Sequence, residues 1–101
     1  MSLSNERMSY VIVTAYEVEL YFFESHHLKD KRRVLKSLIQ RGRQRFGLSI
    51  SEVDHLDHWQ TGTIGLAIVS NSDSHNERII DRFLKAIEEW YPVEITKLSR
   101  Y

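Results

Sequence analysis

The sequence predicts an α+β sandwich in which two helices cover one face of a four-stranded antiparallel sheet. Two amphipathic helical patterns, each with a single apolar stripe, lie at 25–46 and 74–90. Runs of strand-forming residues surround them, which gives the order strand, helix, strand, strand, helix, strand. Because each helix has only one apolar stripe, the pair can bury one face of the sheet and must leave the other face open.

Length and composition fit one compact domain. The chain has 101 residues, of which 42% are hydrophobic and 28% charged, so we expect a single domain over residues 9–101. Residues 1–8 have no periodic pattern and are expected to form a flexible N-terminal tail. The first apolar run, Tyr10 to Ala15, is too short to span a membrane. The chain has no cysteine, which excludes thiolate chemistry and is compatible with the reducing cytoplasm, where we expect the protein to act.

The first strand is predicted at 9–23, a run of β-branched and aromatic residues without glycine or proline. In its second half Val18, Leu20 and Phe22 alternate with residues of the opposite face, as in a strand buried on one side. Its first half is apolar on both faces. We therefore expect the first half of the strand to be buried on both faces and the second half to be buried on one face.

The first helix is predicted to begin after Ser25 or His27 as the N-cap and to end before Gly47, since glycine is the preferred residue just past a helix. Gly42 lies on its apolar stripe, where the missing side chain would let the helix approach the sheet closely. Six residues at helical spacing form this stripe: Leu28, Leu35, Leu38, Ile39, Gly42 and Phe46.

Two strands are predicted next, at 48–54 and 61–70, and the second is apolar on both faces, which suits a central strand. In the second helix, the spacing of Ser74 and Glu77 predicts a capping box. Pro92 ends that helix, and a last strand of mixed polarity at 93–98 is typical of a sheet edge. The order predicts a ferredoxin-like βαββαβ sandwich with the first and third strands in the centre.

The open face of the predicted sheet is partly apolar. It carries Val11, Val13, Ala67 and Val69, which together would expose an apolar patch to water, and this exposure is unfavourable. Self-association of two copies through this face would bury the patch, so we expect a homodimer.

Charge is distributed unevenly along the chain. The chain is formally neutral, but residues 25–46 hold eight of the fourteen lysines and arginines against a single acid, Asp30. The first helix is therefore strongly cationic, and the rest of the domain carries the balancing negative charge.

The cationic helix predicts contact with nucleic acid. Cations on one flank can displace the counterions of a phosphate backbone and hold it without reading its sequence. The alternative is a solvated helix whose charges pair with acids of the body such as Glu17, Glu19 or Glu24. At 100° per residue, five cations share the flank that we predict to bind nucleic acid: Lys29, Arg32, Arg33, Lys36 and Arg43.

A second polar cluster follows the second strand. Asp54, His55, Asp57 and His58 lie within five residues and could bind a divalent metal or supply acid–base catalysis. Their spacing matches neither a zinc motif nor a known hydrolase signature. The alternative is that the two aspartates accept backbone N–H groups in a turn, with Trp59 packed nearby.

Three blocks resemble the YlxP-like family of small bacterial proteins, which implies a ferredoxin-like domain without an assigned biochemical function. The genes of that family often lie beside genes for translation initiation and ribosome maturation, which implies a ribosome-associated partner but no catalytic residue. The sequence departs from the usual pattern at His27 and His58. The blocks are Ser25-His26 with Leu28-Lys29-Asp30-Lys31-Arg32, then Glu52-Val53-Asp54-His55 with Asp57 to Trp59-Gln60, and Val69-Ser70-Asn71.

We therefore predict a non-enzymatic module without a cofactor or a bound metal that contacts RNA or a ribosome-associated partner through its basic helix. A small metal-dependent or acid–base hydrolase centred on Asp54, His55, Asp57 and His58 is the first alternative. A protein-binding adaptor is the second.

Overall fold

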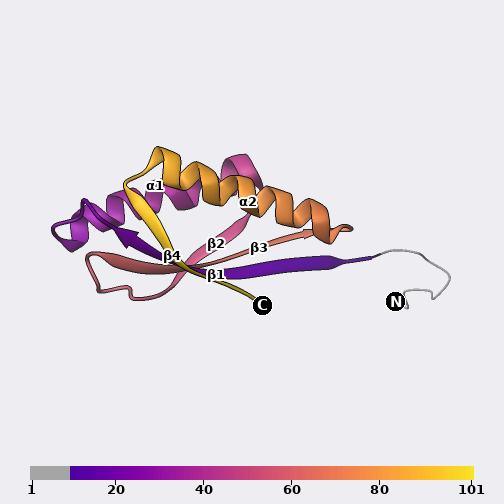
Figure 1. Ribbon diagram of the computed structural model, residues 1–101, viewed down its shortest axis with the longest axis horizontal. Coiled ribbons are helices and arrows are strands. Elements are labelled where there is room, and N and C mark those ends of the chain that lie inside the picture. The colour runs from indigo at the N-terminus through magenta and orange to yellow at the C-terminus, as the bar shows by residue number, and fades with distance from the viewer. Residues whose placement is uncertain (1–9) are drawn as a thin grey trace.

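The computed structural model describes residues 10–101, and the predicted tail at 1–8 lies outside this range. It confirms the predicted fold class: four antiparallel strands in the order β2-β3-β1-β4 carry two helices on one face (Figure 1). The first and third strands are central, as predicted. The elements are β1 (Ile12–Phe22), α1 (Leu28–Phe46), β2 (Ser49–Asp54), β3 (Thr61–Ser70), α2 (Asp73–Trp90) and β4 (Val93–Arg100).

The core lies between the sheet and the two helices. Val18, Leu20 and Phe22 of β1 alternate toward it and are buried, as their spacing predicts. Leu38 of α1 and Phe83 of α2 reach it from the helical layer and are fully buried. Each buried side chain of this size contributes roughly 1.5–3 kcal/mol, so the shared core holds both helices on the same face.

The apolar stripe of α1 lies against β2 and α2. A Cβ added at Gly42 would lie 2.2 Å from Cδ1 of Ile50 and 2.8 Å from Cε1 of Phe83, so only glycine allows this close approach. The helix ends at Gly47, which is left-handed with φ 66°. Both glycine predictions are confirmed.

The N-cap of α2 differs from the prediction. The helix begins at Asp73 and its N-cap is Ser72, whose hydroxyl accepts from the backbone N–H of His75 at 3.2 Å. The predicted capping box of Ser74 and Glu77 is therefore wrong. Glu77 instead accepts from the Tyr16 hydroxyl and pairs with Arg100. Its carboxylate is therefore engaged in tertiary contacts and does not accept from the backbone N–H that a capping box requires.

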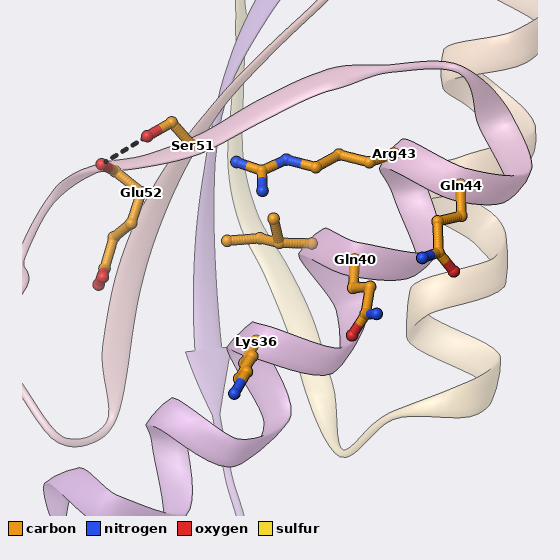
Figure 2. Close-up of a pocket in the computed structure, with 7 residues that line it drawn as sticks. Lys36, Gln40, Arg43, Gln44, Ser51 and Glu52 are labelled. Atoms are coloured by element: carbon orange, nitrogen blue, oxygen red, sulfur yellow. Dashed lines mark hydrogen bonds between the residues drawn. The ribbon is translucent and has the colours of Figure 1, made fainter.

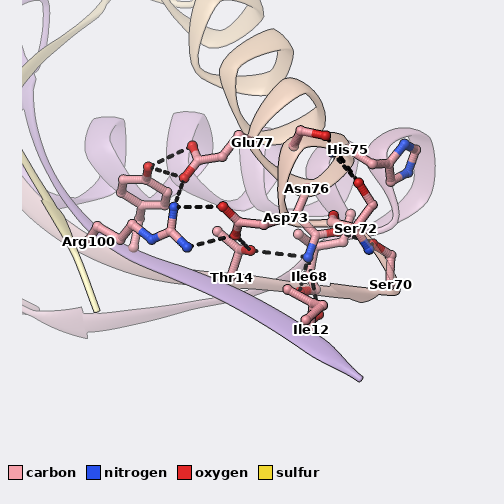
Figure 3. A network of polar contacts seen from close by, with 12 residues as sticks. Ile12, Thr14, Ile68, Ser70, Ser72, Asp73, His75, Asn76, Glu77 and Arg100 are labelled. Carbon is pink, nitrogen blue, oxygen red and sulfur yellow. Dashed lines mark hydrogen bonds and ion pairs between the residues drawn. The ribbon is translucent and has the colours of Figure 1, made fainter. Parts of the chain in front are cut away.

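A polar cluster beneath the first turn of α2 joins three strands to the helix (Figure 3). The buried Asn76 amide donates to the Ile12 carbonyl and the Thr14 hydroxyl, both at 3.1 Å, and accepts from Ser70 at 2.6 Å. The Thr14 hydroxyl in turn donates to Asp73 at 2.8 Å. The pKa of Asp73 lies below its usual value. The hydrogen bond from the Arg100 guanidinium is the main cause, and the hydrogen bond from the Thr14 hydroxyl is the second.

No helix within residues 10–101 is both long enough and apolar enough to cross a membrane.

The two serines at the start of α2 separate the observed cap from the predicted one. We expect Ser72→Ala to lower the free energy of unfolding by about 1 kcal/mol, because an N–H of the first turn loses its acceptor. Ser74→Ala is the matched control and should stay within about 0.5 kcal/mol of the parent. Urea denaturation measures both, and an equal or larger loss at Ser74 would contradict the observed cap.

Candidate functional site

The five cations of the predicted flank, Lys29, Arg32, Arg33, Lys36 and Arg43, are all exposed on α1. Their contacts with acids are long: Arg33 lies 4.0 Å from Asp30, and Arg32 lies 3.8 Å from Glu52. Exposed ion pairs of this kind contribute roughly 0–1 kcal/mol, so they leave the charges available to a ligand.

In the alternative interpretation, Glu17, Glu19 or Glu24 neutralises α1, but none of the three forms an ion pair with α1 within residues 10–101. Glu17 accepts from the Tyr101 hydroxyl at 2.7 Å, and Glu19 accepts from Thr96 at 3.1 Å. Both glutamates alternate with the buried residues of β1 and therefore lie on the open face of the sheet, opposite the helices. Glu17 and Glu19 thus point away from the basic helix.

Arg41, a cation of α1 outside the predicted flank, packs between the two helices. Its guanidinium carbon lies 4.8 Å from the centre of the Trp90 ring and 5.7 Å from that of Tyr91. This cation–π contact ties α1 to the end of α2.

Lys31 is the cation of α1 whose burial the charge pattern did not predict. Its side chain is fully buried, and its ammonium donates to the carbonyls of His55 at 2.7 Å and His58 at 2.8 Å. It also forms an ion pair with Glu52, 3.0 Å from Oε2, and that buried oxygen has no hydrogen bond among the described residues. A signal was present, because Lys31 is four residues before Leu35 on the apolar stripe.

Lys31 brings together two of the sequence blocks that carry the family resemblance. Lys31 itself is part of the first block, and Glu52 and His55 belong to the second. A buried ammonium needs acceptors for its three N–H groups, so the loop after β2 must fold back over the start of α1 to supply them.

The loop cluster has the contacts of a turn. Asp54 accepts from the backbone N–H of His55 at 2.7 Å, and His55 is left-handed with φ 59°. Nδ1 of His55 lies 2.7 Å from the Thr63 hydroxyl, and Nδ1 of His58 lies 3.2 Å from that of Thr61. Asp57 is exposed.

The cluster does not gather into a chelating set. The two imidazole rings lie 5.0 Å apart, centre to centre. Within residues 10–101 the structure has no group of three or more histidine, aspartate or glutamate side chains that could hold a metal ion. The observed geometry therefore favours the turn interpretation over metal binding.

Asp30, the one acid within the basic stretch, organises the start of α1. The N-cap His27 gives no side-chain cap, and the Asp30 carboxylate instead accepts from the backbone N–H of His26 at 3.1 Å. This hydrogen bond is the main cause that lowers the pKa of Asp30, and His27 and Arg33 act in the same direction. Asp30 is thus engaged with the helix start.

A groove of about 550 Å³ runs between α1 and β2 (Figure 2). Arg43 reaches across it and donates from Nη2 to the Ile50 carbonyl at 2.7 Å, which fixes the guanidinium at the edge of β2. Two of the five predicted cations, Lys36 and Arg43, therefore share one concave surface. Its lining is Lys36, Ile39, Gln40, Arg43, Gln44, Ser51 and Glu52.

Comparison with known proteins agrees with the resemblance carried by the three blocks. A family model described as "Protein of unknown function (DUF503)" matches residues 13–100. A curated relative, "Uncharacterized protein YlxP" of Bacillus subtilis (strain 168), is 36% identical over 80 residues, which cover 79% of this chain and 87% of the relative.

Removing the charge of Lys31 tests whether it holds the loop. We expect Lys31→Met to lower the free energy of unfolding by about 3–5 kcal/mol, because Glu52 and two carbonyls lose a buried partner. Lys36→Met, the same change at an exposed site of the same helix, should cost less than about 0.5 kcal/mol. Adding Glu52→Gln to Lys31→Met should recover part of the loss in urea denaturation. Equal losses at Lys31 and Lys36 would contradict this role.

Proposed function

The chain belongs to the DUF503 family of proteins of unknown function, and we propose that it is a non-enzymatic module that binds RNA, free or within a ribosome-associated partner, through α1. One observation carries the proposal: five exposed cations lie on one helix, and among the described residues their ion pairs involve only Asp30 and Glu52. Such a surface attracts a phosphate backbone by releasing its counterions. We place this activity in the cytoplasm.

The helix is a better RNA surface than the open face of the sheet. Sheet-based RNA recognition stacks bases on exposed aromatic residues of the central strands. Here the central strands present Glu17 and Glu19 of β1 opposite Gly65 and Thr63 of β3. Carboxylates at these positions would repel phosphates, so the basic helix remains the favoured contact.

The hydrolase alternative has less support than binding. Catalysis at the loop would need His55 or His58 to be free to move a proton to or from a substrate. One ring nitrogen of each histidine instead lies within hydrogen-bonding distance of a threonine hydroxyl, Thr63 or Thr61. The backbone carbonyls of both histidines also accept from the Lys31 ammonium, so this loop segment helps to hold the fold together.

We also propose that the protein forms a homodimer through the N-terminal half of β1. Pairing with β4 begins at Tyr16, so within the described residues the earlier part of β1 has no strand on that side apart from the bond of Tyr101 to Ala15. Val13 and Val69 are paired across β1 and β3, and their exposed fractions are 57% and 62%.

A free edge beside an apolar strip is a template for pairing with a second copy. Antiparallel pairing of two β1 strands would continue the sheet and bring the two valine strips together. This half of β1 lies beneath the start of α2, to which Asn76 ties Ile12, while α1 packs on β2. The dimer would therefore leave the basic helix open.

RNA binding predicts a defined response to salt and to charge reversal. Fluorescence anisotropy with a short labelled RNA should show an affinity that falls with salt, with a log–log slope of about −2 for roughly three phosphate contacts. Arg33→Glu with Lys36→Glu should abolish most of the binding at low salt. Lys85→Glu on α2, where Lys85 pairs only with Asp81 at 3.0 Å among the described contacts, is the control and should bind as the parent does. Equal loss in the control, or no binding at low salt, would refute the proposal.

If the protein is a dimer, a single substitution in the interface should change the molar mass of the particle in solution. Val13→Glu places a charge in the apolar strip, so light scattering during gel filtration should show a shift from dimer to monomer. Leu56→Glu, at an exposed apolar residue of the β2–β3 loop, is the matched control and should remain dimeric. A monomeric parent protein would refute the proposed interface.

A further inference from the structure

We propose that the groove between α1 and β2 holds one nucleotide of a single-stranded RNA, with its phosphate on Lys36 and Arg43 and its base against Ile39, Gln40 and Gln44. This inference rests on the proposed RNA binding and names the form of RNA that is bound. At about 550 Å³ the groove lies within the usual range of small-ligand sites.

The charge of the groove suits a phosphate. Lys36 and Arg43 enter it from positions two helical turns apart on α1, and Figure 2 shows the Arg43 guanidinium extended toward β2. One Nη2 donor of Arg43 is used by the Ile50 carbonyl, which orients the guanidinium and leaves other donors for an anion.

The carboxylate in the lining does not cancel these cations. Glu52 is in contact with Lys31 at 3.0 Å and Arg32 at 3.8 Å, and its side chain is only 11% exposed. Its charge is therefore balanced from within the protein. The groove keeps the two positive charges of Lys36 and Arg43 for a ligand.

The remaining lining suits a base. Gln40 and Gln44 are one helical turn apart, so their exposed amides lie on the same side of α1 (Figure 2). Each amide offers both donors and an acceptor, which is the mixed pattern that the edge of a base requires. Ile39, which lines the same groove on the side nearer the core, supplies an apolar surface for the face of the base.

This chemistry requires an unpaired strand. In a duplex the base edges are paired and the base faces are stacked, so only phosphates and sugars would reach the groove. A single strand can turn one base into the groove while its phosphates contact the cations. The proposed ligand is therefore single-stranded RNA in preference to a duplex.

An acidic peptide added as a strand to β2 is the competing occupant. Such a peptide would use the outer backbone groups of β2 for its hydrogen bonds. The Ile50 carbonyl on that edge already accepts from Arg43 at 2.7 Å, so strand addition would have to displace the guanidinium. A nucleotide leaves this hydrogen bond in place, which favours RNA.

The experiment compares a short single-stranded RNA with a hairpin duplex by fluorescence anisotropy at low salt. We expect the single strand to bind more tightly to the parent protein. Gln40→Ala and Gln44→Ala keep the charge of α1 and should each weaken single-strand binding about fivefold, the equivalent of one neutral hydrogen bond, without changing duplex binding. Gln60→Ala, at the glutamine that precedes β3, is the control and should leave both affinities unchanged.

The possible failures are distinguishable. No binding of either RNA would refute the proposed function, and the nucleotide site with it. Equal binding of both RNAs, unchanged in Gln40→Ala and Gln44→Ala, would leave phosphate contact intact and refute the nucleotide site. Tighter binding of a labelled acidic peptide than of the single strand would also refute it. Thermal melts of the glutamine variants should match that of the parent, since both side chains are exposed.

Discussion

The buried ammonium of Lys31 is the contact on which the arrangement around α1 depends. An unpaired buried charge is so unfavourable that the chain must supply acceptors, and it does so with the carbonyls of His55 and His58 and the carboxylate of Glu52. These acceptors come from the end of β2 and the loop that follows it. One lysine therefore fixes where this loop lies relative to the helix, and the loop lies against the start of α1.

The same contact decides which charges remain available. Glu52 is the acid of the body that approaches α1, and its carboxylate is engaged by Lys31 and Arg32. Further along the helix, Arg43 is held by a carbonyl instead of a carboxylate, so its charge is not neutralised there. Because Lys31 and Arg32 engage Glu52, Lys36 and Arg43 of the groove remain available to an external anion.

The sequence predicted the features that periodicity determines. The alternation in β1, the apolar stripes of both helices and the close approach at Gly42 follow from local spacing, and together they were sufficient for the strand order. The exposure of the five flank cations could be predicted in the same way. The predicted capping box at Ser74 was wrong because a local motif does not reveal that Glu77 contacts Tyr16 and Arg100, and the N-cap is Ser72.

Lys31 was counted as one more surface cation for the same reason. Its spacing from Leu35 placed it on the buried stripe, but a lysine is rarely buried without partners, and those partners are 21–27 residues further along the chain. Composition alone therefore overstated the positive charge at the surface of α1 and gave no sign of where Glu52 would lie.

The two ends of the helical layer are fixed by different polar contacts, and this bears on binding. Asn76 ties the start of α2 to β1 and β3, while Lys31 ties the start of α1 to the loop after β2. Arg41, stacked on Trp90, joins α1 to the end of α2. Helices held in this way present their side chains on a rigid frame, so a ligand in the groove orders side chains and not backbone, which lowers the entropic cost of binding.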